Sequence, residues 1–376
     1  ILRQLLELDA THLAGEKGRH NASREAYRHG HEQTKVVLDG RKQSMQKPRV
    51  RSKNGSELPL PSLAWFQSED ALNEEILRDL LCGVSTRKYQ RSVAGNGEKG
   101  SCTSKSEVSR RYNASLQTLM YEFFNRPLDG DYVSIMIDGM SVSDMSIIAA
   151  MGIKTDGRKQ VLGLIAGATE NSAVVKQLLA DLIERGLTPD TPRLFVLDGA
   201  KALHKAVSDT FGKMAVIQRC QVHKKRNVLS HLPQSEQANI SLAISKAYLE
   251  FDFSKAKNQL NLLANNLENR YPNAAASLRE GLEETLTVHR LKVPGILRKT
   301  LANTNAMESA NSVAAAHIRR IANWKDGEMI LRHFAAAFLE AEASFRRVSG
   351  YREIPFLVAA LAAESGFSQE SSLLFA

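Results

Sequence analysis

DYVSIMIDGMSVSDMSIIAAMGIKTDGRKQVLGLIAGAT, residues 131 to 169, holds three apolar runs in succession. The runs DYVSIMIDG, MSIIAAMGI and KQVLGLIAGAT are rich in Ile, Met and Val and have the length of strands. TDGRKQ separates the second run from the third, and its Asp-Gly step is typical of a hairpin turn. The stretch therefore predicts three successive β-strands.

Helices and strands alternate in the residues that follow. NSAVVKQLLADLIERG (171–186) predicts an amphipathic helix that ends at Gly186, and KALHKAVSDTFG (201–212) predicts a second helix. RLFVLDG (193–199) and MAVIQRC (214–220) predict a fourth and a fifth strand. Three antiparallel strands, a helix, a strand, a helix and a strand are the order of an RNase H-like core.

The rest of the chain beyond this core is helical in pattern. Helical texture covers about 225–300 and resumes over 305–363. We therefore predict an α/β protein whose RNase H-like core, with a mixed sheet, is interrupted by an all-α insertion. The predicted boundaries are 127–224 for the first part of the core, 225–302 for the insertion and 303–376 for the C-terminal helices.

Two aspartates stand at the predicted ends of buried strands, Asp138 in IMIDGM and Asp198 in FVLDGA. Asp138 could instead belong to a hairpin turn, and Asp198 could cap the helix that starts near Ala200. Together they favour another interpretation, because carboxylates at the ends of neighbouring buried strands repel each other unless a cation lies between them. A third carboxylate would complete a site for two Mg²⁺ ions.

Glu308 lies in NTNAMESANS (303–312), which also reads as the start of a helix. Asn305 would be the N-cap, and Glu308 stands three residues later, where the glutamate of a capping box belongs. Asn305, Glu308, Asn311 and Ser312 recur at helical spacing, so a polar face could also point into a site. Glu308 can cap the helix, hold a metal ion or do both.

The N-terminal part is expected to bind DNA. Residues 1–68 are expected to form one region, helical over 1–35 and extended over 36–66. It contains a basic run, RKQSMQKPRVRSK (41–53). This run is either a solvated loop or an arm that follows DNA phosphates. Over 69–126 we predict a helix at 69–82 and another that begins with a Ser104–Glu107 capping box, as in a helix-turn-helix; a plain surface helix is the alternative. The cations clustered here are Arg87, Lys88, Arg91, Lys99, Lys105, Arg110 and Arg111.

Gly95, Gly97 and Gly100 form a Gly-x-Gly-x-x-Gly pattern in this part of the chain. We reject dinucleotide binding because no buried strand precedes them. They are more simply a flexible connection.

Composition sets broad limits on the class of protein. The 376 residues carry a net charge of +9, which favours a polyanionic partner but does not prove one. Three cysteines are too few for a disulfide framework, and no apolar window is long enough for a membrane span. We expect a cytoplasmic protein whose natural N-terminus lies upstream, because the chain opens on Ile and lacks a signal peptide.

The motifs in order resemble the bacterial Mutator-type insertion-sequence transposases, which are DDE enzymes. The resemblance covers most of the chain. It rests on YRHGHEQTKVVLDG, PRVRSKNG, GVSTRKYQ, SKSEVSRRY, IMIDG, FVLDGAKALHKAV, QRCQVHKKRN, NTNAMESANSVAAAHIRR, ANWKDGEMILRH and FRRVSGY.

The resemblance implies a catalytic triad of Asp138, Asp198 and Glu308 that binds two Mg²⁺ (or Mn²⁺) ions. Water would cleave the ends of an insertion sequence to leave a 3′-OH, which then attacks another phosphodiester with no covalent enzyme intermediate. The implied partners are the terminal inverted repeats and the target DNA, with a homodimer on DNA and no membrane. The implied place is the bacterial cytoplasm, in association with the nucleoid.

Other residues are assigned supporting roles. Cys220 and His223 match the family's Cys/Asp-x2-His motif; alone, they are half a zinc site, and we expect them to support the active site together with Asn305. Arg319 and Arg320 either hold DNA backbone or stabilise the end of a helix. The residues predicted to bind DNA are Arg87, Lys88, Lys105, Ser106, Arg110, Arg111, Arg319 and Arg320.

Two alternative functions stay open at this level. One is a catalytically inactive, transposase-derived regulator that binds DNA. The other, more distant, is a tyrosine recombinase that uses His223 and Arg226, for which Tyr351 is the only late nucleophile. The recombinase would leave Asp138 and Asp198 unexplained.

Overall fold

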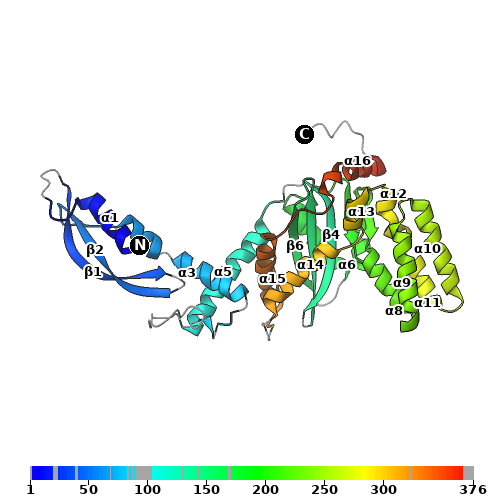
Figure 1. The fold of residues 1–376 in the computed structure, drawn as a ribbon, viewed down its shortest axis with the longest axis horizontal. Helices are drawn as coiled ribbons and strands as arrows, with labels where there is room; N and C mark the ends of the chain where they lie inside the picture. The colour runs from blue at the N-terminus through cyan, green and yellow to red at the C-terminus, as the bar shows by residue number, and fades with distance from the viewer. Residues whose placement is uncertain are drawn as a thin grey trace. The chain divides into compact units, whose positions relative to one another are not determined.

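The computed structural model describes residues 2–19, 24–38, 41–67, 69–82, 84–86, 88–89, 104–128, 131–142, 144–167, 171–319, 321 and 324–366. Over these residues the chain is mixed α/β, with more helix than strand (Figure 1). It divides into two compact units, residues 1–118 and 119–376. No helix of the described residues is long and apolar enough to cross a membrane.

The first unit contains a three-stranded antiparallel sheet in the order β1-β2-β3. Helices α1 and α2 pack on it and bury Leu6, Leu63 and Val50 in a shared core. The elements are α1 (Leu2–Ala14), β1 (Ala26–Leu38), β2 (Arg41–Ser52), β3 (Glu57–Leu58) and α2 (Pro61–Gln67).

The expected division of this region into a helical part up to residue 35 and an extended part over 36–66 is wrong at two places. Strand β1 begins at Ala26, because it pairs along its length with β2 and this pairing overrides local propensity. Helix α2 begins at Pro61, where a proline is tolerated because the first helical N–H groups have no partner inside the helix.

The next two helices are α3 (Glu69–Leu81) and α5 (Lys105–Asn125), and the first confirms the helix predicted at 69–82. Ile76, Leu80 and Val108 share a small core with Tyr89. The Ser104 hydroxyl accepts the Glu107 N–H at 3.2 Å, which is the contact that Ser104 makes in the predicted capping box. The Glu107 carboxylate pairs with Arg111 at 2.9 Å.

The second unit is built on a five-stranded mixed sheet in the order β6-β5-β4-β7-β8. Strands β6, β5 and β4 pair in antiparallel fashion, whereas β4, β7 and β8 are parallel. The five strands lie where the sequence predicts them. They are β4 (Tyr132–Val142), β5 (Met145–Lys154), β6 (Lys159–Gly167), β7 (Arg193–Leu197) and β8 (Ala215–Arg219).

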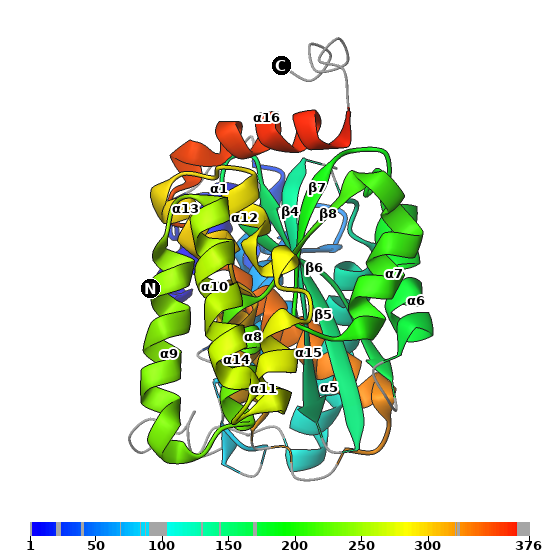
Figure 2. The same cartoon turned by 90° about the vertical axis from the view of Figure 1, so that its right-hand side faces the viewer.

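Helices cover both faces of this sheet (Figure 2). On one face, α6 (Ser172–Glu184) and α7 (Lys201–Phe211) bury Leu179 and Val207 against strand residues such as Ile137. On the other face, Ala310, Phe334 and Leu357 of three C-terminal helices pack against strand residues that include Met136. Those helices are α14 (Asn305–Ile318), α15 (Gly327–Glu342) and α16 (Ile354–Ser365).

A run of helices separates β8 from α14, as the sequence predicts for 225–302. Four of them form a core of their own around Leu260 and Leu278. The elements are α8 (Gln221–Ser230), α9 (Gln234–Leu249), α10 (Phe253–Glu268), α11 (Pro272–Arg279), α12 (Thr287–Arg290) and α13 (Gly295–Leu301). The short 3₁₀ turn η2 (Glu283–Leu286) lies between α11 and α12.

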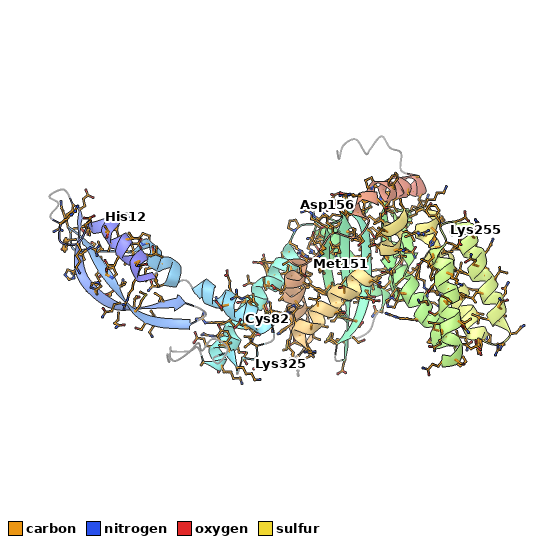
Figure 3. All side chains as sticks on the ribbon, in the orientation of Figure 1. His12, Cys82, Met151, Asp156, Lys255 and Lys325 are labelled. Carbon is orange, nitrogen blue, oxygen red and sulfur yellow. The ribbon has the colours of Figure 1, made fainter. Side chains whose placement is uncertain are left out.

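Two predicted glycine positions are confirmed by the backbone. Asp156, labelled in Figure 3, and Gly157 form the turn between β5 and β6, where Gly157 has φ +84°. Gly186 follows the C-cap of α6 and has φ +114°. A side chain at Gly186 would also meet the chain nearby, because its Cβ would lie 2.5 Å from the Leu128 carbonyl oxygen.

Gly186→Ala should therefore lower the free energy of unfolding by about 2–4 kcal/mol, from backbone strain plus the forced shift of Leu128. Urea denaturation measures this loss. Gly366→Ala is the matched control, because Gly366 also has a positive φ but no atom of the described residues within 4 Å of its added Cβ. The control should lose about 1 kcal/mol, and equal losses in the two variants would contradict the role of the Leu128 contact.

Candidate active site

The two aspartates follow residues that are paired across neighbouring parallel strands. Ile137 of β4 is in register with Leu197 of β7. Asp138 is the residue after Ile137, and Asp198 is the residue after Leu197. Strand β7 ends at Leu197, but β4 continues to Val142 and pairs Asp138 with Ala149 of β5. The expectation that Asp138 ends its strand is therefore wrong, because β5 extends the pairing beyond the end of β7. The hairpin alternative for Asp138 fails with it.

Asp138 is nearly inaccessible and is contacted from helix α14. Its side chain is 5% exposed, and the Asn311 amide donates to its Oδ2 at 3.3 Å. Asn311 is itself 8% exposed, and its Oδ1 atom is buried with no hydrogen-bond partner in the described part of the chain. A buried amide oxygen without a partner is costly, so Asn311 Oδ1 is able to accept a hydrogen bond or to bind a cation.

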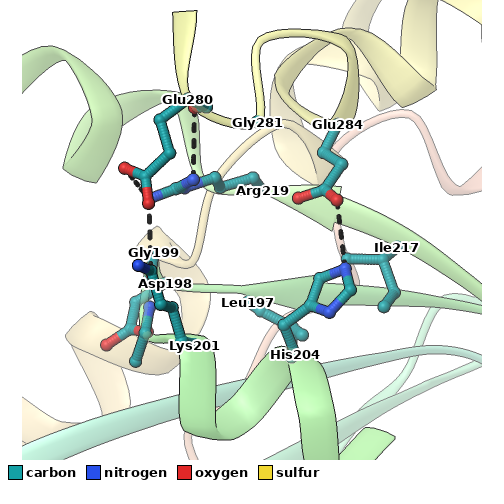
Figure 4. Close-up of a pocket in the computed structure, with 11 residues that line it drawn as sticks. Leu197, Asp198, Gly199, Lys201, His204, Ile217, Arg219, Glu280, Gly281 and Glu284 are labelled. Carbon is teal, nitrogen blue, oxygen red and sulfur yellow. Dashed lines mark hydrogen bonds and ion pairs between the residues drawn. The ribbon is translucent and has the colours of Figure 1, made fainter. Parts of the chain in front are cut away.

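Asp198 lies in the loop between β7 and α7. It is half-buried, and its Oδ1 accepts the Ala200 N–H at 2.8 Å. The N-cap of α7 is Ala200, and no side chain caps this helix. Asp198 is thus not the N-cap, the alternative considered from the sequence. It borders a cavity of about 220 Å³ whose charged wall is drawn in Figure 4.

Helix α14 begins without the predicted capping box. Its N-cap is Thr304, which makes no side-chain cap bond, and Asn305 is its first residue. The Thr304 hydroxyl is directed to the Cys220 sulfur at 3.6 Å, and the Asn303 side chain accepts the Asn305 N–H at 3.0 Å. The box is wrong because Glu308 lies beyond the N3 position of this helix, which leaves its carboxylate for other contacts.

The Glu308 carboxylate faces two cationic side chains of α8. His223 Nε2 lies 3.4 Å and Arg226 Nη1 lies 3.5 Å from Glu308 Oε1. Asn311 is one helical turn after Glu308, so the two side chains share a face of α14. Since Asn311 bonds to Asp138, this face of α14 turns toward β4.

Cys220 and His223 lie at the junction of β8 and α8. Cys220 is fully buried; burial by itself raises the pKa of its thiol, but contacts with His223 and Thr304 outweigh burial and lower that pKa. The Cys220 side chain raises the pKa of His223 to about 9, against the opposing effect of burial, and Asp138 and Glu308 add to the rise. His223 is therefore a cation at neutral pH, next to the carboxylates.

The pair Cys220 and His223 is not joined by further ligands. Among the residues that the structure describes, no three His, Cys, Asp or Glu side chains converge closely enough to hold a metal ion. This applies to Asp138, Asp198 and Glu308 as well, so the three predicted ligands lie in neighbouring elements without forming a closed metal site. Asn305, also predicted to support the site, is exposed at the first position of α14.

The residues predicted to bind DNA have different surroundings. Lys88, Lys105, Ser106 and Arg110 in the first unit are exposed, as is Arg319 in the second. Arg111 is half-buried and bonds to Glu107 and to Asn73 at 3.0 Å, so its guanidinium has structural partners. Arg87 and Arg320 lie outside the described residues.

Sequence reasoning missed two contributors to the site. Arg226 was considered only as a recombinase residue, although its spacing from His223 puts both on one face of α8. Arg219 was passed over as the end of a strand, yet it is 8% exposed and lines the cavity next to Asp198. Its burial had no sequence signal, because arginines are mostly exposed.

His223 should titrate near pH 9 in the metal-free protein and not near its ordinary value of 6.5. Since the folded-state pKa is raised, protonation of His223 stabilises the fold fully below about pH 6.5, and this contribution is lost as the pH rises through 9. NMR of the imidazole measures the titration. Cys220→Ala should lower the midpoint, and a wild-type midpoint near 6.5 would contradict the proposed electrostatics.

Comparison with known proteins confirms the family resemblance that the motifs of the chain indicate. The family model described as "Transposase, Mutator family" matches residues 1–347. The transposase for insertion sequence element ISRM5 of Rhizobium meliloti is 27% identical over 93% of this chain and 88% of its own length. The transposase for IS256 in transposon Tn4001 of Staphylococcus aureus is 26% identical over 83% of this chain and 80% of its own. The chain belongs to the Mutator family of transposases.

Proposed function

We propose that the protein is a DDE transposase that cleaves the ends of an insertion sequence and joins the resulting 3′-OH to DNA. The observation that carries the proposal is that α14 contacts β4 beside the point where β7 ends. Asp138 and Asp198 follow residues paired in register, and Asn311 ties α14 to Asp138 one turn from Glu308.

The strand order supports an RNase H-like core. Three antiparallel strands are followed by two parallel strands, in the order β6-β5-β4-β7-β8, with helices on both faces. Helices α8 to α13 are then the insertion, and α14 returns the chain to the sheet with Glu308 in its first turns. In such a sheet the functional groups gather where the parallel strands end.

The three acids have the chemistry of ligands for a divalent cation. Asp138, Asp198 and Glu308 would supply hard oxygen ligands of the kind that Mg²⁺ prefers, and the unpartnered Oδ1 of Asn311 is a further oxygen beside Asp138. Two such ions, when bound, would supply activation of the attacking oxygen and stabilisation of the leaving oxygen. Mn²⁺ would serve in the same way.

The chain's own residues would bind and orient the DNA strand. His223 and Arg226 place two positive charges beside Glu308, where they can attract a phosphodiester. Water would attack one phosphodiester, which breaks its P–O3′ bond and leaves a free 3′-OH. That 3′-OH would then attack the target phosphodiester, whose own 3′ oxygen leaves.

DNA recognition is proposed for both units, with the terminal inverted repeats and target DNA as partners and a homodimer as the active form. Lys88, Lys105, Ser106 and Arg110 offer exposed groups around α5, as a helix-turn-helix would. Arg319 offers a cation at the end of α14. Arg111 is better assigned to holding α5 on α3, since it bonds to Asn73.

The tyrosine recombinase hypothesis gains no support from the positions of Tyr351 and His223. Tyr351 packs at Gly157, in the turn next to the start of β4, since Tyr132 pairs with Lys154. Asp138 is six residues further along β4, or about 20 Å at the usual rise of a strand. His223 contacts Glu308 near the Asp138 end, so the nucleophile and its supposed partners are far apart.

Glu308→Gln should abolish Mg²⁺-dependent cleavage of duplexes that carry the element's own ends, by well over a hundredfold, because even indirect partners of a metal cost 10–100-fold. Gel assays measure cleavage, and binding to the same duplex should persist. Asp209→Asn, an exposed acid on α7 paired with Lys176, is the control. Full activity in the Glu308→Gln variant would remove Glu308 from the catalytic set.

Asn311→Ala should raise the Mg²⁺ concentration for half-maximal cleavage by about 10–100-fold, because Asn311 holds Asp138 and docks α14. Ser312→Ala is the neighbouring control, since the Ser312 hydroxyl is directed to the Glu308 carbonyl oxygen within the helix. An Asn311→Ala enzyme with the metal dependence of the wild type would show that this contact does not serve the reaction.

A further inference from the structure

Arg219 joins the helical insertion to the loop that carries Asp198 (Figure 4). It is the last residue of β8 and is buried, with 8% of its surface exposed. Its guanidinium donates to the Gly199 carbonyl oxygen at 3.1 Å and to the Glu280 carbonyl oxygen at 3.2 Å. It also reaches the Glu280 carboxylate at 3.3 Å. One side chain thus binds two segments, at Gly199 and Glu280, that are 81 residues apart.

A single peptide group relays this contact to the Asp198 carboxylate. The Gly199 carbonyl and the Ala200 N–H belong to the same peptide bond, which is planar and rigid. Arg219 holds the oxygen of this peptide, and the N–H on its other side donates to Asp198 Oδ1 at 2.8 Å. The direction of the carboxylate therefore depends on the plane that Arg219 fixes.

Two glycines leave the space that the guanidinium fills. A Cβ at Gly199 would lie 2.6 Å from Arg219 Nη2, and a Cβ at Gly281 would lie 2.6 Å from Nη1. Gly281 also has φ +60°, a conformation that other residues rarely adopt. The guanidinium is thus enclosed by the Asp198 loop on one side and the insertion loop on the other.

The insertion side of this contact is itself anchored. Lys224 of α8 is 1% exposed, and its ammonium group donates to the carbonyl oxygens of Ser277 and Glu280. A second tie joins His204 of α7 to Glu284 at 3.0 Å across the same cavity. Movement of the loop 280–284 would therefore act on Arg219 directly.

We propose that Arg219 is a positioning residue through which the helical insertion sets the direction of the Asp198 carboxylate. The chain of contacts runs from Glu280 to Arg219, to the peptide between Gly199 and Ala200, and to Asp198. The proposal rests on the proposed function, in which Asp198 is a metal ligand. It adds a role for the insertion in assembling the site.

Binding of Mn²⁺, followed by the EPR signal of the free ion, tests this role without DNA and without turnover. Arg219→Gln should weaken Mn²⁺ binding by about 10–100-fold, the usual cost of losing an indirect partner of a metal. Arg219→Lys should retain part of the affinity, because an ammonium can reach one acceptor but cannot bridge both as the planar guanidinium does. Arg279→Gln is the matched control, since Arg279 pairs with Glu268 on the surface of the insertion.

Gly281→Ala gives an independent test, because its methyl group would displace Nη1 while Arg219 stays in the sequence. It should weaken Mn²⁺ binding in the same direction, and circular dichroism establishes that each variant is folded. Folded Arg219→Gln and Gly281→Ala proteins with wild-type Mn²⁺ affinity would overturn the positioning role and leave the proposed function intact. An Asp198→Asn protein with wild-type affinity would instead overturn Asp198 as a ligand, and the proposed function with it.

Discussion

The buried carboxylate of Asp138, next to the half-buried Asp198, is the constraint around which the candidate site is arranged. Asp138 is 5% exposed, and a buried carboxylate is costly unless hydrogen bonds or cations compensate for it. The chain supplies them from three directions: Asn311 from α14, His223 from α8 and the Ala200 N–H for the neighbouring Asp198. Helix α14, helix α8 and the loop after β7 thus each supply a partner to these acids, in addition to the apolar core that α14 shares with the sheet.

The run of helices from α8 to α13, the proposed insertion, is part of this arrangement and is bonded to the sheet. It packs around its own apolar core, but its loop after α11 returns to the sheet and bonds to Arg219. Gln218 extends the same junction, because its amide donates to the Thr285 carbonyl oxygen at 2.9 Å and accepts the Val288 N–H at 3.0 Å. Two consecutive residues at the end of β8 thus tie the insertion to the strands next to Asp198.

Much of the sheet could be predicted from the sequence, because strands buried on both faces leave continuous apolar runs such as that around Ile137. The two aspartates stood out for the same reason, as charges at the ends of those runs. The extension of β4 past Asp138 could not be predicted, since it depends on β5. Nor could the start of α14, where the Thr304 hydroxyl turns to Cys220, 84 residues away. Helix and strand in residues 1–66 were misjudged because long-range pairing of β1 with β2 decides them.

A structure of the protein bound to a DNA end and Ca²⁺, which takes oxygen ligands of the same kind as Mg²⁺, tests the central claim most directly. We expect carboxylate oxygens of Asp138, Asp198 and Glu308 at about 2.3–2.6 Å from bound ions. We also expect that Glu308 leaves its contacts with His223 and Arg226 to reach them. Ions bound by the two aspartates with Glu308 still paired to His223 and Arg226 would contradict the assignment of the third acid.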